Sequence, residues 1–263
     1  MSTNAVPLSL LGKVALITGG SRGIGAATVR MFRQAGAQVV FNYRAAASRA
    51  TQLVEECGAD DTCPVQQELG TVEDGRALVE AAVRAFGRLD ILVANHGVWP
   101  PHDQPIGAMT DEQWRSTLGV NLDSIFGLVS AATAQMQTQR PDAHGTRGHI
   151  VLVASTAAQR GEAFHADYAA SKGALLSLTK SLSSELAPQG ILANCVAPGW
   201  VQTEMSAEAL NGPSASKYLA TIPLGRAAHP EEIAGPILFL CTPLAGFVSG
   251  EIFNVNGGAV LVG

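Results

Sequence analysis

Several features are scarce in this chain, and each shortage excludes a class of protein. Charged residues make up 15% of the 263 residues, aromatic residues make up 5%, and the formal net charge is -5. No run of lysine or arginine occurs. Surfaces that bind nucleic acids or anionic membranes need clustered basic side chains, so neither partner is expected. The unbroken apolar stretches are no longer than a strand, which predicts no membrane-spanning segment.

Cysteine is also sparse. The four cysteines (Cys57, Cys63, Cys195 and Cys241) are scattered and form no Cys-x-x-Cys pair, and the six histidines show no metal-ligand spacing. This pattern predicts free thiols in a reducing compartment and no metal site. The first residues carry neither the charged segment nor the long apolar segment of a signal peptide. We therefore expect a cytoplasmic protein.

Apolar residues, by contrast, make up 47% of the chain, enough for a large core. Short apolar runs predict strands over 13–18, 38–42, 62–66, 90–94, 148–154, 191–196 and 251–255. Helices are predicted between them, over 23–34, 45–57, a segment that ends at Gly87, most of 111–139, 166–186 and 231–241. Continuous apolar strands that alternate with helices indicate an α/β fold, a doubly wound parallel sheet with helices on both faces. We interpret 1–263 as one domain, with a tail over 1–10.

Two segments depart from this regular pattern. Gly235 and Pro236 fall inside the predicted helix 231–241, where a proline should kink or split the helix. The segment 140–147 contains proline, glycine and aspartate, so we expect a solvated loop there with no function.

A glycine-rich loop follows the first predicted strand. Gly19, Gly23 and Gly25 let the backbone approach a phosphate closely at the start of the next helix, which predicts a nucleotide-binding loop. A Walker A loop would need lysine after the last glycine, where Ala26 stands. A hydrolase with Ser21 as the nucleophile of a Gly-x-Ser-x-Gly elbow stays as an alternative. That elbow needs an oxyanion loop on an earlier strand, for which there is little room.

A tyrosine and a lysine lie one helical turn apart at the start of the helix predicted over 166–186. Tyr168 and Lys172 are four residues apart, so both project from one face. A phenol titrates near ~10 in water, and a nearby ammonium should lower that pKa. Tyr168 would then act as a general acid for a carbonyl oxygen or a general base for an alcohol. Ser155, just after the preceding strand, could donate a hydrogen bond to the same oxygen.

These motifs occur in a specific order along the chain. The glycine loop is followed by Asn95-His96-Gly97, Asn121, Ser155, the Tyr168-x-x-x-Lys172 pair and Pro198-Gly199. Their order and spacing resemble the short-chain dehydrogenase/reductase family, from about Gly12 to Gly258. The chain looks most like the branch that contains 3-oxoacyl-carrier-protein reductases and bacterial glucose dehydrogenases. The resemblance implies a Rossmann-like sheet, hydride transfer at a nicotinamide and a homotetramer.

The resemblance also implies residue roles. Asn121, Ser155, Tyr168 and Lys172 match the family's catalytic tetrad, with Tyr168 as proton donor or acceptor and Ser155 steadying the substrate oxygen. Lys172 would bind the nicotinamide ribose and lower the pKa of Tyr168, and Asn121 would hold a water that relays protons to Lys172. The cofactor-binding residues would be Gly19, Ser21, Arg22, Gly23, Ile24, Gly25, Asn42, Tyr43, Arg44, Glu68, Leu69, Asn95, Gly97, Tyr168, Lys172, Pro198, Gly199, Val201 and Thr203.

The end of the second predicted strand bears on cofactor choice. Members of this family that are specific for NAD place an aspartate there, which holds the ribose diol and would repel a 2′-phosphate. This chain instead has Asn42, Tyr43 and Arg44, with no acid. Arg22 and Arg44 could both reach a 2′-phosphate, because guanidinium groups suit phosphate geometry. We expect NADP(H) to be preferred and NAD(H) use to be possible.

Two positions differ from the family pattern. His96 stands where the family usually has alanine, and we interpret it mainly as a local packing change, with ligand contact as the minor alternative. Glu68-Leu69 stands where an aspartate usually meets the adenine. The longer glutamate side chain should still accept a hydrogen bond there, with altered geometry.

The substrate is less evident from the sequence. We expect a mobile lid over 203–224 and an opposite wall of Trp99, Pro100, Pro101 and Phe164. Such a largely apolar pocket would admit ketones, acyl thioesters or sugars. We expect a reductase of 3-oxoacyl thioesters or ketones, with a sugar or alcohol dehydrogenase as the alternative. A dinucleotide-binding redox sensor without catalysis is the alternative from another class of protein.

Overall fold

The computed structural model describes residues 8–261 of the chain. Most of the predicted tail over 1–10 therefore lies outside the described residues. At its end the prediction was wrong, because the Leu10 side chain is only 1% exposed and belongs to the core. The Leu10 amide also donates to the carbonyl oxygen of Ala35 at 2.8 Å. This contact fixes the chain where it enters the first strand.

The centre of the fold is a parallel sheet, as predicted. Its strands are β1 (Val14–Ile17), β2 (Gln38–Tyr43), β3 (Thr62–Gln66), β4 (Ile91–Ala94), β5 (Gly148–Val153), β6 (Ile191–Pro198) and β7 (Ile252–Val255). The 7-stranded sheet has the order β3-β2-β1-β4-β5-β6-β7, and all its neighbouring strands are parallel. The order reverses direction between β1 and β4. In such sheets ligands bind at this switch point, outside the carboxyl ends of the strands.

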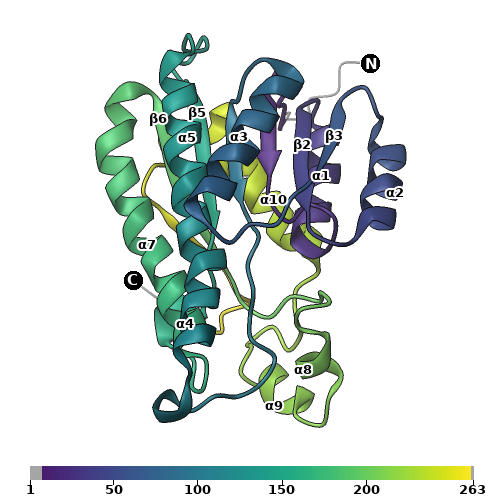
Figure 1. The fold of residues 1–263 in the computed structure, drawn as a ribbon, viewed down its shortest axis with the longest axis vertical. Helices are drawn as coiled ribbons and strands as arrows, with labels where there is room; N and C mark the ends of the chain where they lie inside the picture. Colours follow the sequence, from purple (N-terminus) through teal and green to yellow (C-terminus); the bar gives the residue numbers. More distant parts are fainter. Residues whose placement is uncertain (1–7, 262–263) are drawn as a thin grey trace.

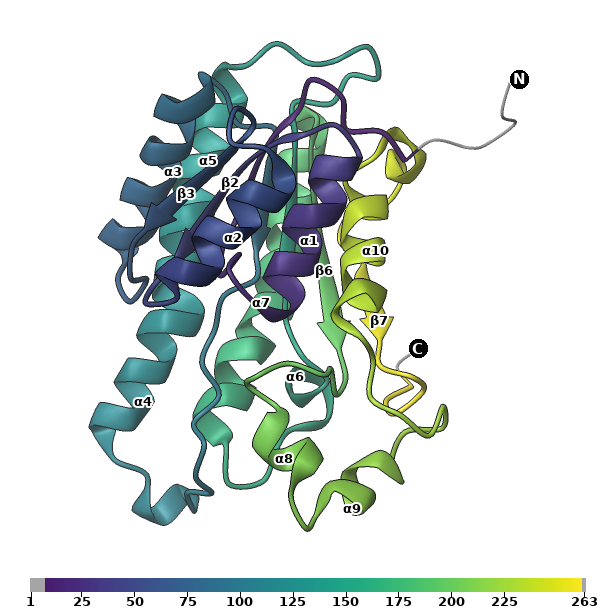
Figure 2. The same cartoon turned by 90° about the vertical axis from the view of Figure 1, so that its right-hand side faces the viewer.

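Helices cover both faces of the sheet (Figures 1 and 2). The helices are α1 (Gly23–Gln34), α2 (Ala47–Cys57), α3 (Val72–Phe86), α4 (Asp111–Leu118), α5 (Ser124–Thr138), α6 (Ala157–Arg160), α7 (Ala166–Leu186), α8 (Ala207–Asn211), α9 (Ala215–Leu219) and α10 (Pro230–Leu240). Alternate residues of a strand point to opposite faces. Accordingly, Ile17 packs in the core that includes Phe32 of α1 and Ile237 of α10. Its neighbour Leu16 packs in the second core, with Leu78 of α3 and Leu175 of α7.

The ends of the helices follow local sequence signals. The Thr71 side chain accepts a hydrogen bond from the Asp74 amide at 3.2 Å, and the Asp74 carboxylate accepts one from the Thr71 amide at 2.9 Å. This capping box begins α3. Gly87 ends α3 in the left-handed conformation, with φ of 75°, as its position in the sequence predicted.

The prediction for Pro236 was wrong in one respect. The helix α10 runs from Pro230 to Leu240 without a break, with Pro236 in its interior. Ile233, Ala234 and Ile237 around it are buried against the sheet and α1. Burial of these side chains outweighs the one backbone hydrogen bond that the proline removes.

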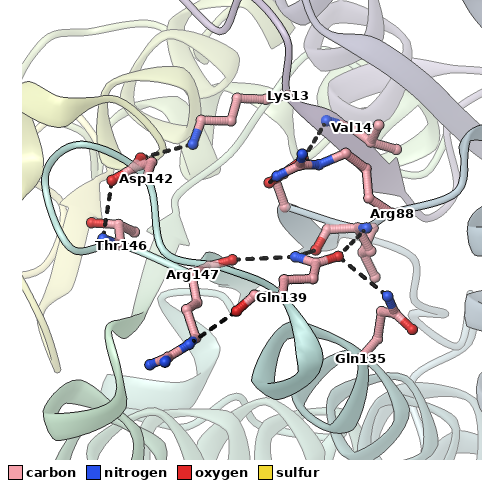
Figure 3. A network of polar contacts seen from close by, with 10 residues as sticks. Lys13, Val14, Arg88, Gln135, Gln139, Asp142, Thr146 and Arg147 are labelled. Carbon is pink, nitrogen blue, oxygen red and sulfur yellow. Dashed lines mark hydrogen bonds and ion pairs between the residues drawn. The ribbon is translucent and has the colours of Figure 1, made fainter.

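The segment between α5 and β5 is a loop, as predicted, but it is tied down at both ends (Figure 3). Asp142 accepts a hydrogen bond from the Lys13 ammonium at 2.8 Å and from the Thr146 amide at 3.0 Å. The Arg147 guanidinium donates to the carbonyl oxygens of Gln139 and Gln189, at 3.1 and 2.7 Å. These contacts lie at the amino-terminal side of the strands, away from the switch-point edge. They support a structural role for the loop.

One helical stretch, Asp111–Thr138, is long and apolar enough to cross a membrane by length and composition, with a mean hydropathy of 1.2. Half of its most apolar window is buried inside the protein, as in the core helices of proteins that never enter a membrane. The stretch is interrupted by a π-helical turn, Gly119–Asp123, between α4 and α5. Such single turns are frequent at functional sites.

Candidate active site

One pocket opens at the carboxyl ends of the strands, at the switch point between β1 and β4. The loops that follow β1 to β6 all contribute to its lining. Every site residue predicted from the sequence lines this pocket except Gly25 and Asn121. The structure thus brings together segments that are far apart in the chain.

The glycine loop forms the end of the pocket beside α1. A side chain at Gly25 would place its Cβ 2.1 Å from the Gly19 carbonyl oxygen, so only glycine fits there. Gly25 therefore shapes the loop from behind and does not line the pocket. Gly19 and Gly23 have positive φ of 66° and 51°, which glycine adopts without strain. Thr203 lies against the same loop, since a Cβ at Gly23 would be 3.0 Å from its methyl group.

The amino terminus of α1 faces this end of the pocket. The N-cap residue Arg22 makes no side-chain cap with the first turn of the helix. Free N–H groups and the helix dipole favour an anion at such a position. The loop and helix therefore fit the phosphates of a dinucleotide.

The side chains after β2 and β3 form the far rim of this end. Asn42 is buried, accepts a hydrogen bond from the Gly19 amide at 2.8 Å and donates to the Gln67 carbonyl at 2.9 Å. Asn42 therefore holds the loops together. Arg22 and Arg44 are exposed and line the pocket. The Arg44 guanidinium lies 3.4 Å from the Glu68 carboxylate, but both side chains are about two-thirds exposed, so this pair is weak.

His96 lies in the floor of the pocket, and both of its ring nitrogens are occupied. Nδ1 is 2.7 Å from the Thr18 hydroxyl, and Nε2 is 3.0 Å from the Val120 carbonyl and 2.8 Å from the Ser124 hydroxyl. A carbonyl can only accept, so Nε2 carries the proton and Nδ1 accepts from Thr18. Burial, together with the charge of Lys172, lowers the pKa of His96 to about 3. The ring is neutral and connects the segments after β1 and β4 to the π-helical turn. This supports the interpretation of His96 as a packing residue.

Asn121 lies in the π-helical turn and is fully buried. Its side-chain oxygen accepts a hydrogen bond from the Val98 amide at 2.8 Å, and its nitrogen donates to the Val98 carbonyl at 2.9 Å and to the Ser171 hydroxyl at 3.1 Å. The side chain thus pins the segment after β4, beside Gly97. Both amide protons are used, so the Asn121 side chain could bind a relay water only through its oxygen.

Tyr168 and Lys172 both line the pocket, one turn apart on α7, with Ser155 at the end of β5. The expected lowering of the Tyr168 pKa is not found. Burial raises this pKa to about 12, and the hydrogen bond with Ser155 only partly opposes it. The Lys172 ammonium donates to the Val153 carbonyl at 2.8 Å, and burial lowers its pKa to about 8. At neutral pH, Tyr168 therefore holds a proton that it can give to a carbonyl oxygen.

The other end of the pocket is aromatic. Trp99 stacks on His165 with ring centroids 4.7 Å apart and meets Trp200 edge to face at 6.3 Å. Trp200 in turn packs against Tyr218, which comes from the predicted lid, at 4.8 Å. Packed rings of this kind form a rigid wall.

The predicted substrate walls are partly wrong. Of the four residues proposed for one wall, only Trp99 lines the pocket. Phe164 is half exposed with a positive φ of 66°, and the Pro100 carbonyl is bound by His165. On the lid side Met205 lines the pocket, whereas Ile222 is buried away from it.

Sequence reasoning missed three charged residues in the lining, of which Glu204 lies in the segment predicted as a lid and two lie outside every predicted segment of the site. Arg160 and Glu162 lie between the end of β5 and the start of α7 and reach the same pocket as Tyr168. The signal that could have found them is positional. Ser155 and Tyr168 both face the pocket, so the segment that joins them has to pass over its mouth.

The hydrolase alternative lacks its partners. Within residues 8–261 no histidine is hydrogen-bonded to Ser21, and His96, the histidine that lines the pocket, is bonded to Thr18 instead. A serine nucleophile needs an adjacent base.

Comparison with known proteins agrees with this geometry. The chain is 35% identical to the 3-oxoacyl-(acyl-carrier-protein) reductase of Vibrio cholerae, over 97% of this chain and 100% of that one. A family model described as enoyl-(acyl carrier protein) reductase matches residues 19–260. The chain belongs to the short-chain dehydrogenase/reductase family. As a member of this family it is an NAD(P)-dependent oxidoreductase.

Two further members of the family are similar over nearly the whole chain. The L-rhamnose 1-dehydrogenase (NAD(P)(+)) of Azotobacter vinelandii is 36% identical, with 95% of this chain and 97% of that one covered. The solved structure of a blue fluorescent protein from a metagenomic library, in complex with NADPH, has a TM-score of 0.87. It is 35% identical, and the match covers 96% of this chain and 100% of that one. The Rossmann-like fold predicted from the sequence is confirmed.

Proposed function

We propose that the protein interconverts a carbonyl compound and a secondary alcohol with NADP(H), and that Tyr168 is its general acid and base. The observation that carries this proposal is that Tyr168, Lys172 and Ser155 line the same pocket as the glycine loop. Burial keeps Tyr168 protonated at neutral pH, which suits donation to a developing alkoxide.

The residues divide the work in a simple way. When bound, the nicotinamide cofactor supplies or accepts the hydride. Ser155 steadies the substrate oxygen with a hydrogen bond, and Tyr168 transfers the proton to or from that oxygen. Lys172 holds the nicotinamide ribose, and Asn121 keeps the segment after β4 in register beside it. The lost proton of Tyr168 is replaced through Lys172 and water.

The preference for NADP(H) rests on the rim of the glycine-loop end. No acid follows β2, and Arg22 and Arg44 are both exposed in the lining. Their guanidinium groups can bind a 2′-phosphate with paired hydrogen bonds. The Azotobacter relative is named for both cofactors, so NAD(H) is the second candidate.

The substrate is proposed to be a small carbonyl compound or alcohol. The relatives name two classes, 3-oxoacyl-(acyl-carrier-protein) and a sugar. A redox sensor without catalysis is less well supported, because every predicted tetrad residue is chemically competent. A homotetramer in the cytoplasm, built from single-domain subunits, completes the proposal.

The test is Tyr168→Phe, measured with NADPH against a panel of carbonyl compounds. We expect kcat/KM to fall by roughly 1000-fold, within the range of an acid–base group. NADPH affinity, measured by nicotinamide fluorescence, should change little, since the phenol oxygen is the only atom removed. Full activity in this variant would overturn the mechanism.

A further inference from the structure

The mouth of the pocket carries a charged pair that the hydride-transfer chemistry does not use. Arg160, the last residue of α6, and Glu162 flank Gly161 between β5 and α7, and both line the pocket. Glu162 lies close enough to Tyr168 for its charge to raise the pKa of that phenol, although burial is the larger cause. A substrate held by Tyr168 would therefore meet this pair.

Glu162 is held in place by its surroundings. Its loop is fixed to the segment after β4, because the Gln104 amide donates to the Phe164 carbonyl at 3.0 Å and the His165 ring binds the Pro100 carbonyl at 3.0 Å. Phe164 adopts a positive φ of 66°, a conformation that is uncommon for a bulky side chain. Strained residues of this kind cluster where a binding site is preorganised.

The two charges together define what the mouth can accept. Burial raises the pKa of Glu162, while His165, Arg160 and a hydrogen bond from Trp99 act in the opposite direction. A cationic ligand would be repelled by the Arg160 guanidinium, and an anionic ligand would be repelled by the Glu162 carboxylate. A neutral hydroxyl group suits both, because it donates to the carboxylate and accepts from the guanidinium.

The aromatic wall fits the same class of ligand. Trp99 is fixed by stacking on His165 and by its edge contact with Trp200. The electron-rich face of such a ring attracts the polarised C–H groups of a carbon that bears a hydroxyl. A long acyl chain would instead offer no hydrogen-bond donor or acceptor to Glu162 and Arg160 and would exclude water from both charged groups, which is costly.

We propose that Glu162 and Arg160, together with the Trp99 and Trp200 rings, select a neutral polyhydroxylated substrate of the sugar class. Glu162 is thus a specificity-determining residue. This inference rests on the proposed function, since the sugar hydroxyl that reacts is the one at Tyr168. An acyl thioester on an acidic carrier protein is disfavoured, because Arg160 is matched by Glu162 at the same mouth.

The test compares two kinds of ring substrate that differ in hydroxyl groups with an acyclic 3-oxo ester. Aldohexoses and cyclohexanol are assayed with NADP+, and ethyl 3-oxobutanoate is assayed with NADPH. We expect the wild-type protein to prefer the aldohexoses. Glu162→Ala should raise KM for the preferred aldohexose by about 10- to 100-fold, the loss of a hydrogen bond to a charged group. Its kcat should stay nearly constant, and turnover of cyclohexanol should not fall.

The controls separate this inference from the proposed function. Asp103→Ala removes a neighbouring carboxylate that is 75% exposed and outside the pocket lining, and should leave both KM values unchanged. Unaltered NADPH affinity shows that the Glu162 variant is folded, and Glu162→Gln should recover part of the sugar affinity. Preference for ethyl 3-oxobutanoate, or an equal loss on sugar and cyclohexanol in Glu162→Ala, overturns the inference and leaves the proposed function intact. Absence of turnover on all three classes contradicts the proposed function itself.

Discussion

The two ends of the pocket are built in different ways. The cofactor end is made of backbone, because Gly19, Gly23 and Gly25 leave space that no side chain can fill. The substrate end is made of side chains on loops, with Trp99 and Glu162 as its main features. Backbone geometry restricts the residue type and leaves a spacing in the sequence. Side chains on loops leave no such spacing, so the two ends differ in how well a sequence reveals them.

The largest effect on cofactor binding is expected at the most restricted backbone position. In Gly25→Ala the new Cβ would lie 2.1 Å from the Gly19 carbonyl oxygen and 2.8 Å from the side-chain nitrogen of Asn95, so the loop has to move. A shift of about 1 Å in a positioned group costs on the order of 100-fold in rate. We expect kcat/KM to fall by at least about that factor, and NADPH affinity, measured by nicotinamide fluorescence, to fall with it.

A glycine without such contacts gives the matched control. Gly235, inside α10, has no atom within 4 Å of an added Cβ and no positive φ. Gly235→Ala should therefore keep full NADPH affinity and stabilise the fold by up to about 1 kcal/mol. If both variants bind NADPH equally well, the cofactor end is not shaped by its backbone as argued here.

A smaller effect is expected where side chains contribute to the cofactor end. Arg44→Ala should weaken NADPH binding by about 10- to 100-fold, the value of a hydrogen bond between charged groups, and leave NADH binding unchanged. Parallel fluorescence titrations with the two nucleotides measure this difference. Arg84→Ala, on the exposed face of α3, removes a similar charge outside the pocket and serves as the control. Equal losses for NADPH and NADH would refute a 2′-phosphate role for Arg44.

The same contrast explains how much of the fold and of the site could be predicted from the sequence. Strand and helix positions followed from hydrophobic periodicity, and the Tyr168–Lys172 pair followed from helical spacing. Glu162 could not be found in this way, since its place depends on how a loop folds over the pocket. The continuity of α10 through Pro236 and the burial of Leu10 were also missed, because tertiary packing decides both. Sequence patterns report local geometry, whereas these residues depend on contacts far along the chain.

The stability of the fold in acid offers a further comparison, between the partly buried His96 in the pocket and the buried His149 outside it. Burial lowers the pKa of His96 to about 3 and that of His149 to about 4. Below pH 6.5, the ordinary pKa of histidine, the unfolded chain binds a proton at each of these rings. The folded chain does not bind these protons until a lower pH. Stability is therefore lost as the pH falls from about 6.5 towards 4, by about 1.4 kcal/mol per pH unit for each ring.

Urea unfolding at pH 7, 6 and 5 measures this loss. His149→Gln, at the start of β5 and outside the pocket lining, should reduce the slope and leave NADPH binding unchanged. An identical slope in the variant and the wild-type protein would show that His149 is not held neutral by its burial.

The smallest effect on activity is expected from His96, although it lines the pocket. His96→Ala restores the residue that the family usually has, and removes contacts to Thr18, Val120 and Ser124. The lost hydrogen bonds should cost about 1 to 3 kcal/mol in the free energy of unfolding. Both kcat and KM should change by less than about tenfold, well below the roughly 100-fold minimum for an acid–base group. Urea unfolding measures the effect on stability, and steady-state kinetics at pH 7 measures the effect on kcat and KM. A loss as large as that of Tyr168→Phe would move His96 from the scaffold of the pocket into its chemistry.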